Sequence, residues 1–208
     1  MKIPFLASLF LFLWVLSRQL KRHTKSIQEQ QASFWQRERA ANNVRKKPLD
    51  DLKYITIPLD KLPADRHLDN ETVEDCISTL SILSQRKIVN LSCISNTDLK
   101  LTYGTANITA LTEYDQNYTL LVTTLQKWAD AIYTLGDVDG TRALLEYAVS
   151  IESDVTKTYS LLASIYEQNG ENSRIATLIE AAEKLSSHSG KMIVRKLKEA
   201  YPCSDLMG

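Results

Sequence analysis

The chain contains few residues that interrupt helices. Its 208 residues include only six glycines and five prolines. Neither residue occurs between Pro4 and Pro48. Glycine and proline are the residues least compatible with a helix interior, so their scarcity favours a helical structure.

Residues that commonly bind metals or perform catalysis are also scarce. The cysteines and histidines lie far apart in the sequence, at Cys76, Cys93, Cys203, His23, His67 and His188. No CxxC pair, HExxH motif, glycine-rich phosphate loop or nucleophile elbow is present. The sequence therefore predicts no enzyme activity, no metal, no cofactor and no small-molecule substrate. Three separated cysteines are typical of a reducing compartment.

The formal net charge is zero, but the charge is unevenly distributed. Residues 1–50 contain ten Lys or Arg against three Asp or Glu, whereas the remainder contains fifteen against twenty-two. A basic arm attached to an acidic body favours contact of the arm with a membrane surface. The acidic body does not favour nucleic-acid binding.

A long apolar run lies at the N-terminus, from Ile3 to Leu16. It approaches the roughly 17–25 residues that span a bilayer. Only Lys2 precedes it, whereas a basic cluster follows at Arg18, Lys21, Arg22 and Lys25. We interpret residues 1–18 as a transmembrane anchor, and the positive-inside rule places the body in the cytoplasm. The sequence thus predicts a single-pass protein of the cell membrane that resembles small bacterial membrane proteins.

The main alternative is a cleaved secretory signal peptide followed by an exported protein. Val15 and Ser17 are acceptable residues before a cleavage site. Four matches to the N-glycosylation pattern also keep this alternative open, at Asn70, Asn90, Asn107 and Asn117. The basic cluster after the apolar run argues against export.

Residues 19–47 are rich in good helix formers and predict a basic helical stalk. One continuous helix from Phe5 to Lys47 is compatible with the sequence. Leu20, Ile27 and Phe34 recur at heptad spacing, which indicates either a weak coiled coil or a solvated stalk.

Pro48, Pro58 and Pro63 mark a change of character. Residues 48–69 lack helical periodicity, and we interpret them as an extended, proline-containing strap that covers the helical body. Asp69 or Asn70 is expected to cap a helix from about residue 71 to 84. Residues 85–118 are less regular. They allow a short strand or irregular link at 88–94 and short helices at 99–103 and 106–114.

Two segments near the C-terminus match each other at a constant sequence offset, which equals the separation of Gly136 and Gly170. In each segment an apolar helical stripe leads to a Gly-acidic turn at this glycine, and a second helix follows. Small residues recur where paired helices approach closely, with Ala129 matching Ala163 and Ala148 matching Ala182. The first pair is expected at about 120–135 and 140–152, and the second at about 155–169 and 173–185.

This pattern resembles the tetratricopeptide repeat, a helix–turn–helix unit with a period of about 34 residues. The resemblance covers about a third of the chain. It departs from the family at the early second-helix position, where Thr141 and Ile175 replace a small residue, and at the unit ends, where Ser153 and Ser187 replace proline.

The resemblance implies an all-α fold, a short α-solenoid of antiparallel helix pairs preceded by a single N-terminal transmembrane helix and stalk. The helical repeat domain would occupy residues 70–208. Its repeats would lie at about 122–155 and 156–189, and a capping helix at 190–201.

The same resemblance implies a function. In the family, first-helix residues that do not pack inward line a groove that binds peptides or helices. The equivalent positions here are Gln126, Asp130, Tyr133, Lys157, Ser160, Ser164 and Glu167. We therefore expect a membrane-anchored adaptor or scaffold that binds another protein, with the membrane contacted through the N-terminal helix and its basic flank. The alternatives are a structural subunit of a membrane complex and an exported repeat protein.

Overall fold

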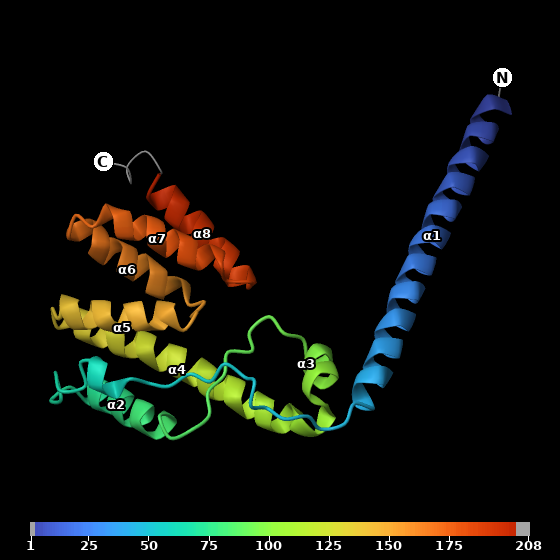
Figure 1. The fold of residues 1–208 in the computed structure, drawn as a ribbon. Coiled ribbons are helices and arrows are strands. Elements are labelled where there is room, and N and C mark those ends of the chain that lie inside the picture. Colours follow the sequence, from blue (N-terminus) through green and yellow to red (C-terminus); the bar gives the residue numbers. More distant parts are fainter. Residues whose placement is uncertain (1–2, 203–208) are drawn as a thin grey trace. The chain divides into compact units, whose positions relative to one another are not determined.

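The chain is all-α throughout the part that a computed structural model describes (Figure 1). The backbone is described for residues 3–202, and side chains for 12–14, 16–19 and 28–202. Between residues 3 and 202 there is no strand, and one isolated antiparallel bridge joins Tyr54 to Val89. The described chain forms two compact units, residues 1–48 with 95–108 and residues 49–94 with 109–208.

The first unit contains α1 (Ile3–Asn42), α3 (Asn96–Tyr103) and the short 3-10 helix η2 (Thr105–Asn107). α1 is one continuous helix, as the absence of internal proline and glycine favours, and it ends before the expected boundary at Lys47. Phe34 and Trp35 are exposed on α1, and their rings meet edge to face at 5.4 Å. The remaining heptad positions, Leu20 and Ile27, lie outside the described side chains.

The C-terminal end of α1 is held by α3. Glu38 accepts a hydrogen bond from Thr97 Oγ1 at 2.6 Å and pairs with Lys100. One turn further on, Ala41 is fully buried. Gly104, with φ +86°, lies so close to the Arg45 carbonyl that a Cβ would be 2.2 Å from its oxygen. The C-terminal end of α1 and the residues directly after it are therefore tightly packed against α3 and Gly104.

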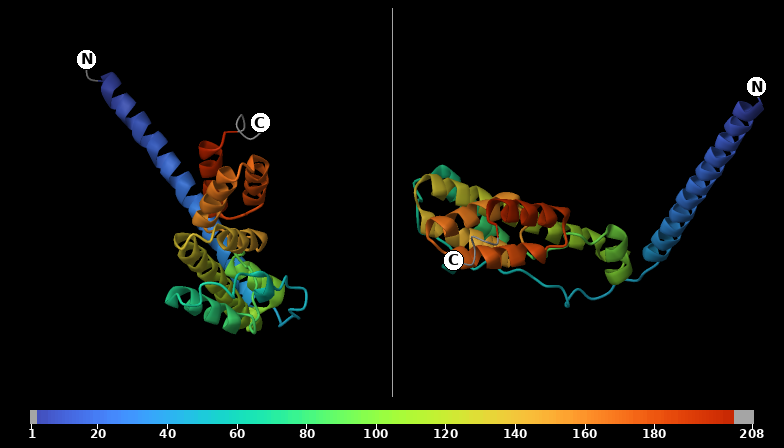
Figure 2. Two further views of the ribbon diagram at one scale, coloured as in Figure 1. Left: turned by 90° about the vertical axis from the view of Figure 1, so that its left-hand side faces the viewer. Right: turned by 90° about the horizontal axis from the view of Figure 1, so that it is seen from above.

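The second unit contains most of the chain. Its helices are α2 (Glu71–Leu83), α4 (Ile108–Thr134), α5 (Val138–Ser150), α6 (Thr156–Gln168), α7 (Asn172–Glu183) and α8 (His188–Ala200). Within this unit α6 packs against α5, α7 and α8, and the helices lie in successive layers (Figures 1 and 2). The core is formed by the predicted apolar stripes, including Leu125, Trp128, Leu162 and Ala163.

Several helix boundaries differ from those expected. The short helix predicted at 106–114 and the repeat helix predicted from about 120 are one helix, α4, because no glycine or proline separates them. The 88–94 segment is an irregular link. α8 starts at His188 because Ser187 caps it, its hydroxyl accepting a hydrogen bond from Gly190 N at 3.0 Å.

The segment from Leu49 to Leu68 contains no α-helix, but it is not extended throughout: besides the 3-10 turn η1 (Leu59–Lys61) it forms turns at residues 50–52 and 62–66. Ile57 and Leu62 are buried in the core. Tyr147 donates a hydrogen bond from its hydroxyl to the Thr56 carbonyl at 3.2 Å. The segment therefore covers part of the second unit.

The same turn occurs twice, once in each matching segment. Gly136 N donates to Tyr133 O at 3.0 Å, and Gly170 N donates to Glu167 O at 2.9 Å. Both glycines have positive φ, the conformation in which a residue without Cβ is least strained. The ends of α4 and α6, and likewise the starts of α5 and α7, are separated by the same number of residues as the two glycines.

No helix among the described residues combines the length and the apolarity that a membrane span requires. Most of the predicted anchor, residues 1–18, lies outside the side chains that the structure describes. Within it Phe12, Leu13, Trp14 and Leu16 are exposed.

Candidate protein-binding surfaces

The seven predicted groove residues lie on α4 and α6. Gln126 is buried, with 9% of its surface exposed, so its expected place on an open groove is wrong. Its side chain connects the two helices. Gln126 Oε1 accepts from Thr158 Oγ1 at 2.7 Å, and Gln126 Nε2 donates to Asp130 Oδ1 at 2.9 Å. Burial of an amide is tolerated here because both ends are hydrogen-bonded.

The face between α4 and α6 is closed by a second contact. Lys157 Nζ donates to the other oxygen of Asp130 at 2.7 Å. The Asp130 carboxylate thus accepts one hydrogen bond from Gln126 of its own helix, α4, and one from Lys157 of α6. A partner that bound Asp130 or Lys157 would first have to replace these internal contacts.

The other predicted residues differ in accessibility. Tyr133 is half-buried and packs against the core. Ser160 and Glu167 are exposed, and Ser164 is half-buried. Their contacts are local or weak: Ser160 donates to Thr156 O of its own helix at 3.1 Å, and Glu167 accepts from Tyr201 of α8 at 3.3 Å.

Each residue of the closed α4–α6 face has an equivalent, one repeat offset later in the sequence, on the neighbouring α6–α8 face. The positions equivalent to Gln126 and Asp130 are Ser160 and Ser164, and the position equivalent to Thr158 is Met192. Met192 is 38% exposed on α8. Two short hydroxyls and a thioether cannot form the amide hydrogen bonds of the first face, so these positions do not close the α6–α8 face in the same way.

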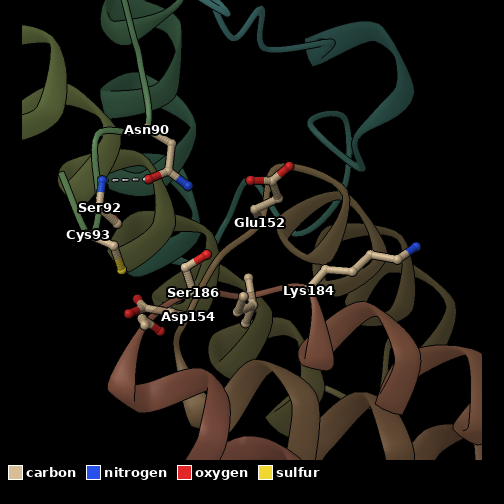
Figure 3. A pocket seen from close by; sticks show the side chains of 9 residues that line it. Asn90, Ser92, Cys93, Glu152, Asp154, Lys184 and Ser186 are labelled. Carbon is tan, nitrogen blue, oxygen red and sulfur yellow. Dashed lines mark hydrogen bonds between the residues drawn. The ribbon is translucent and has the colours of Figure 1, made fainter.

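A polar pocket lies at one end of the second unit (Figure 3). It has a volume of about 100 Å³ and is formed by three segments: the link after α2, the α5–α6 turn and the α7–α8 turn. Its lining comprises Asn90, Ser92, Cys93, Glu152, Asp154, Lys184, Leu185, Ser186 and Ser187. No sequence pattern predicts this pocket, because residues that come from three separate turns share no local pattern.

Buried hydrogen bonds fix the shape of this pocket. Tyr118 of α4 donates to the carbonyls of Ile151 and Glu152, at 3.2 and 2.9 Å. Burial raises the pKa of Tyr118 far above its ordinary value, so the hydroxyl stays a donor. Glu152 and Cys93 both have positive φ, at 63° and 72°. Such backbone conformations persist only where surrounding contacts hold them.

An apolar groove of about 400 Å³ lies between α5, α6 and α7. Its floor includes Val149, Leu162 and Leu178, and Glu146 and Arg174 lie at its rim, 3.0 Å apart.

Glu146 belongs to an ion-pair network that ties α5, α6 and α7 together. It also pairs with Arg142 at 2.9 Å and accepts from Tyr166 at 2.8 Å. Burial alone would raise the pKa of Glu146, but these hydrogen bonds and the arginine charges lower it below its usual range. The rim charges are therefore satisfied internally.

No cluster of three His, Cys, Asp or Glu side chains suited to a metal ion occurs within the described residues. Cys76 is buried, and burial raises the pKa of its thiol, whereas Cys93 is exposed. Cys203 lies outside the described residues. No protein family, curated protein or solved structure matches the chain.

Proposed function

We propose that this chain is a membrane-anchored adaptor whose stacked helix pairs bind another protein. The fold would be a short solenoid similar to tetratricopeptide repeats, with two units and a capping helix, α8. A solenoid presents one face of each first helix to the outside, so its surface suits binding better than catalysis.

The observation that carries this proposal is the recurrence of local geometry at the sequence period. The Gly136 and Gly170 turns have matching hydrogen bonds, and the helix ends on either side of them repeat at the same offset. Ala129, Ala148, Ala163 and Ala182, the four small positions of the motif, are all buried. Coincident sequence spacing alone would not require equivalent turns.

The binding face that fits best lies on α6 and α8. On the α4–α6 face, Gln126 and Asp130 already form hydrogen bonds within the fold, so they are not free to bind a partner. On α6, Ser160 and Glu167 are exposed, and on α8 Met192, at the position equivalent to Thr158, is 38% exposed. A partly exposed thioether is an adaptable apolar contact, and it is common at binding surfaces.

Membrane attachment forms the second part of the proposal. Residues 1–18 would insert in the cell membrane, and α1 would carry the helical domain on the cytoplasmic side. Arg18 lies 5.3 Å from the centre of the Trp14 ring, a cation–π contact that suits the interface between apolar core and headgroups. The basic residues that follow would be attracted to anionic lipids.

Binding is tested by proximity labelling of the full-length protein in its native membrane, followed by affinity measurement with each identified partner. Ser160→Arg places a long charged side chain on the α6 face without entering the core. We expect a loss of affinity of at least about tenfold. Ser78→Arg, at an exposed serine of α2, is the matched control and should bind normally. Equal affinity of both variants for every partner would refute the α6–α8 face.

Membrane attachment is tested separately. A chain that starts at residue 19 should be lost from the membrane fraction after an alkaline carbonate wash, whereas the full chain should be retained. A topology reporter fused after Gly208 should be active only if it works in the cytoplasm. Activity of an export-dependent reporter at this position would contradict the proposed orientation.

A further inference from the structure

We propose that the polar pocket between the link after α2 and the α5–α6 and α7–α8 turns binds a basic side chain, a lysine ammonium or an arginine guanidinium, of the partner protein. The proposal rests on the protein-binding part of the proposed function and adds the chemistry of one contact. It does not depend on the α6–α8 face.

The charge of the pocket is set by one carboxylate. Glu152 is neutralised by Lys53, whose ammonium lies 2.9 Å from it. Lys184 points away from the other lining side chains (Figure 3). The carboxylate of Asp154 has neither a hydrogen bond nor an ion pair with any described residue, and Figure 3 shows it in the pocket near Ser186 and Cys93.

Helix dipoles do not reverse this sign. α5 and α7 end beside the pocket, and each contributes a partial negative charge of roughly 0.5 at its C-terminus. α6 and α8 begin beside it and contribute the same amount of positive charge. Because these partial charges oppose one another, the full negative charge of Asp154 decides which ligand is favoured.

The neighbouring groups suit a cationic N–H donor. The Ser186 hydroxyl can accept a hydrogen bond alongside the Asp154 carboxylate, and Asn90 Oδ1, which accepts from Ser92 N at 3.0 Å, keeps a second lone pair for the ligand. A volume of about 100 Å³ accommodates one side chain and not a helix. Ligand donors that meet a carboxylate form the stronger, charge-assisted type of hydrogen bond.

A second hollow gives the rest of an extended peptide a place to lie. It has a volume of about 220 Å³, shares Asn90 and Glu152 with the polar pocket, and continues along residues 53–56. A partner segment that placed a basic residue beside Asp154 would therefore have room for a neighbouring residue along the strap.

The test uses two small probes with the full-length protein in detergent. Nα-acetyl-lysine-N-methylamide carries the ammonium group, and the corresponding norleucine amide replaces it with a methyl group. Binding is followed from amide NMR shifts at residues 90–93, 152–154 and 184–187. We expect saturation by the lysine probe with a dissociation constant of about 5 mM, the scale of a single small contact.

Two variants distinguish charge from space. Asp154→Asn keeps the shape and should weaken binding of the lysine probe at least about fivefold, because a neutral amide loses the charge-assisted contact. Ser186→Met fills the pocket while keeping the charge and should also weaken it. Asp139→Asn, an exposed carboxylate in the first turn of α5, is the control and should bind like the unmodified protein.

Saturable shifts that are specific to the lysine probe and are lost in both pocket variants support the proposal. Absence of saturation, equal binding of the norleucine probe, or full binding by folded Asp154→Asn overturns it. None of these outcomes alters the affinity of an identified partner for Ser160→Arg, so failure here is distinguishable from failure of the adaptor function.

Discussion

Replacing Asp137 by alanine should destabilise the second unit by removing three contacts at the start of α5. Asp137 Oδ1 accepts from Gly140 N at 2.8 Å and caps the helix. Arg66 from the strap donates to the same carboxylate at 3.1 and 3.2 Å, and His67 Nε2 lies 3.3 Å from it. The side chain thus joins the strap to the turn between α4 and α5.

The magnitude follows from these contacts. Loss of a helix cap costs about 1 kcal/mol, and the pair with half-exposed Arg66 contributes about 0.5 kcal/mol more. Asp137→Ala should therefore lower the free energy of unfolding by about 1.5 kcal/mol and the melting temperature by about 3–6 °C. Asp139→Ala, at an exposed position in the first turn of α5, should lower the free energy of unfolding by at most about 0.5 kcal/mol.

The effect should also depend on pH. Burial raises the pKa of Asp137, but the Gly140 amide and the Arg66 guanidinium lower it more, so the folded-state pKa is below its ordinary value. Stability from this carboxylate is then fully present above the unfolded pKa of about 3.9 and is lost as the pH falls through the lower folded value. Chemical denaturation at pH 7 and at about pH 2.5 measures the difference between the two proteins. A difference that stays constant over this range, or an equal cost of Asp139→Ala, would refute the reasoning.

Three further substitutions test other parts of the structure. Tyr118→Phe removes the hydroxyl that holds the turn after α5, leaves carbonyls without a buried donor, and should cost about 1–2 kcal/mol in urea unfolding. Gly104→Ala drives a Cβ against the Arg45 carbonyl at a positive φ and should speed amide exchange after α1, while α4–α8 keep their protection. Ala163→Leu overpacks a fully buried position and should cost about 1–3 kcal/mol, whereas Ser160→Leu on the exposed face of the same helix should cost less than about 0.5 kcal/mol.

Hydrophobic periodicity was sufficient to predict the core of the helical body. Trp128, Ala129 and Ile132 repeat at helical spacing, and all three are buried. The Gly136 and Gly170 turns were predictable for a similar local reason, because each requires positive φ directly after a helix. Features that depend on a few neighbouring residues are therefore visible in the sequence.

Features that depend on distant partners were not visible. In the sequence Gln126 resembles a surface residue of an amphipathic helix. Only its hydrogen bond to Thr158 of α6, the first helix of the second repeat, explains its burial. The ion pair between Glu38 of α1 and Lys100 of α3 joins residues that are 62 positions apart in the sequence. Asp154 belongs to a pocket only because three turns meet. A polar residue has no intrinsic pattern that reveals which partner the fold will bring to it.

The asparagines of two of the four glycosylation motifs are buried in the fold. A glycan would be attached at Nδ2 of the asparagine. Asn107 is 2% exposed and its Nδ2 donates to Lys47 O and Tyr103 O, both at 2.7 Å. Asn117 is 5% exposed and donates to Lys87 O at 3.0 Å. Glycans at these positions would break the hydrogen bonds and could not fit inside the folded chain.

The other two motifs remain compatible with the fold, since the side chains of Asn70 and Asn90 are half-exposed and use their oxygens as acceptors. If the domain is directed to a eukaryotic secretory lumen, its folded fraction should carry at most two glycans, which gel mobility before and after enzymatic deglycosylation would count. Asn107→Gln and Asn117→Gln should leave that number unchanged. A folded protein with four glycans and an unaltered melting temperature would contradict the burial of these residues. The side chains of Asn107 and Asn117 form internal hydrogen bonds, so packing accounts for these two asparagines without a glycan.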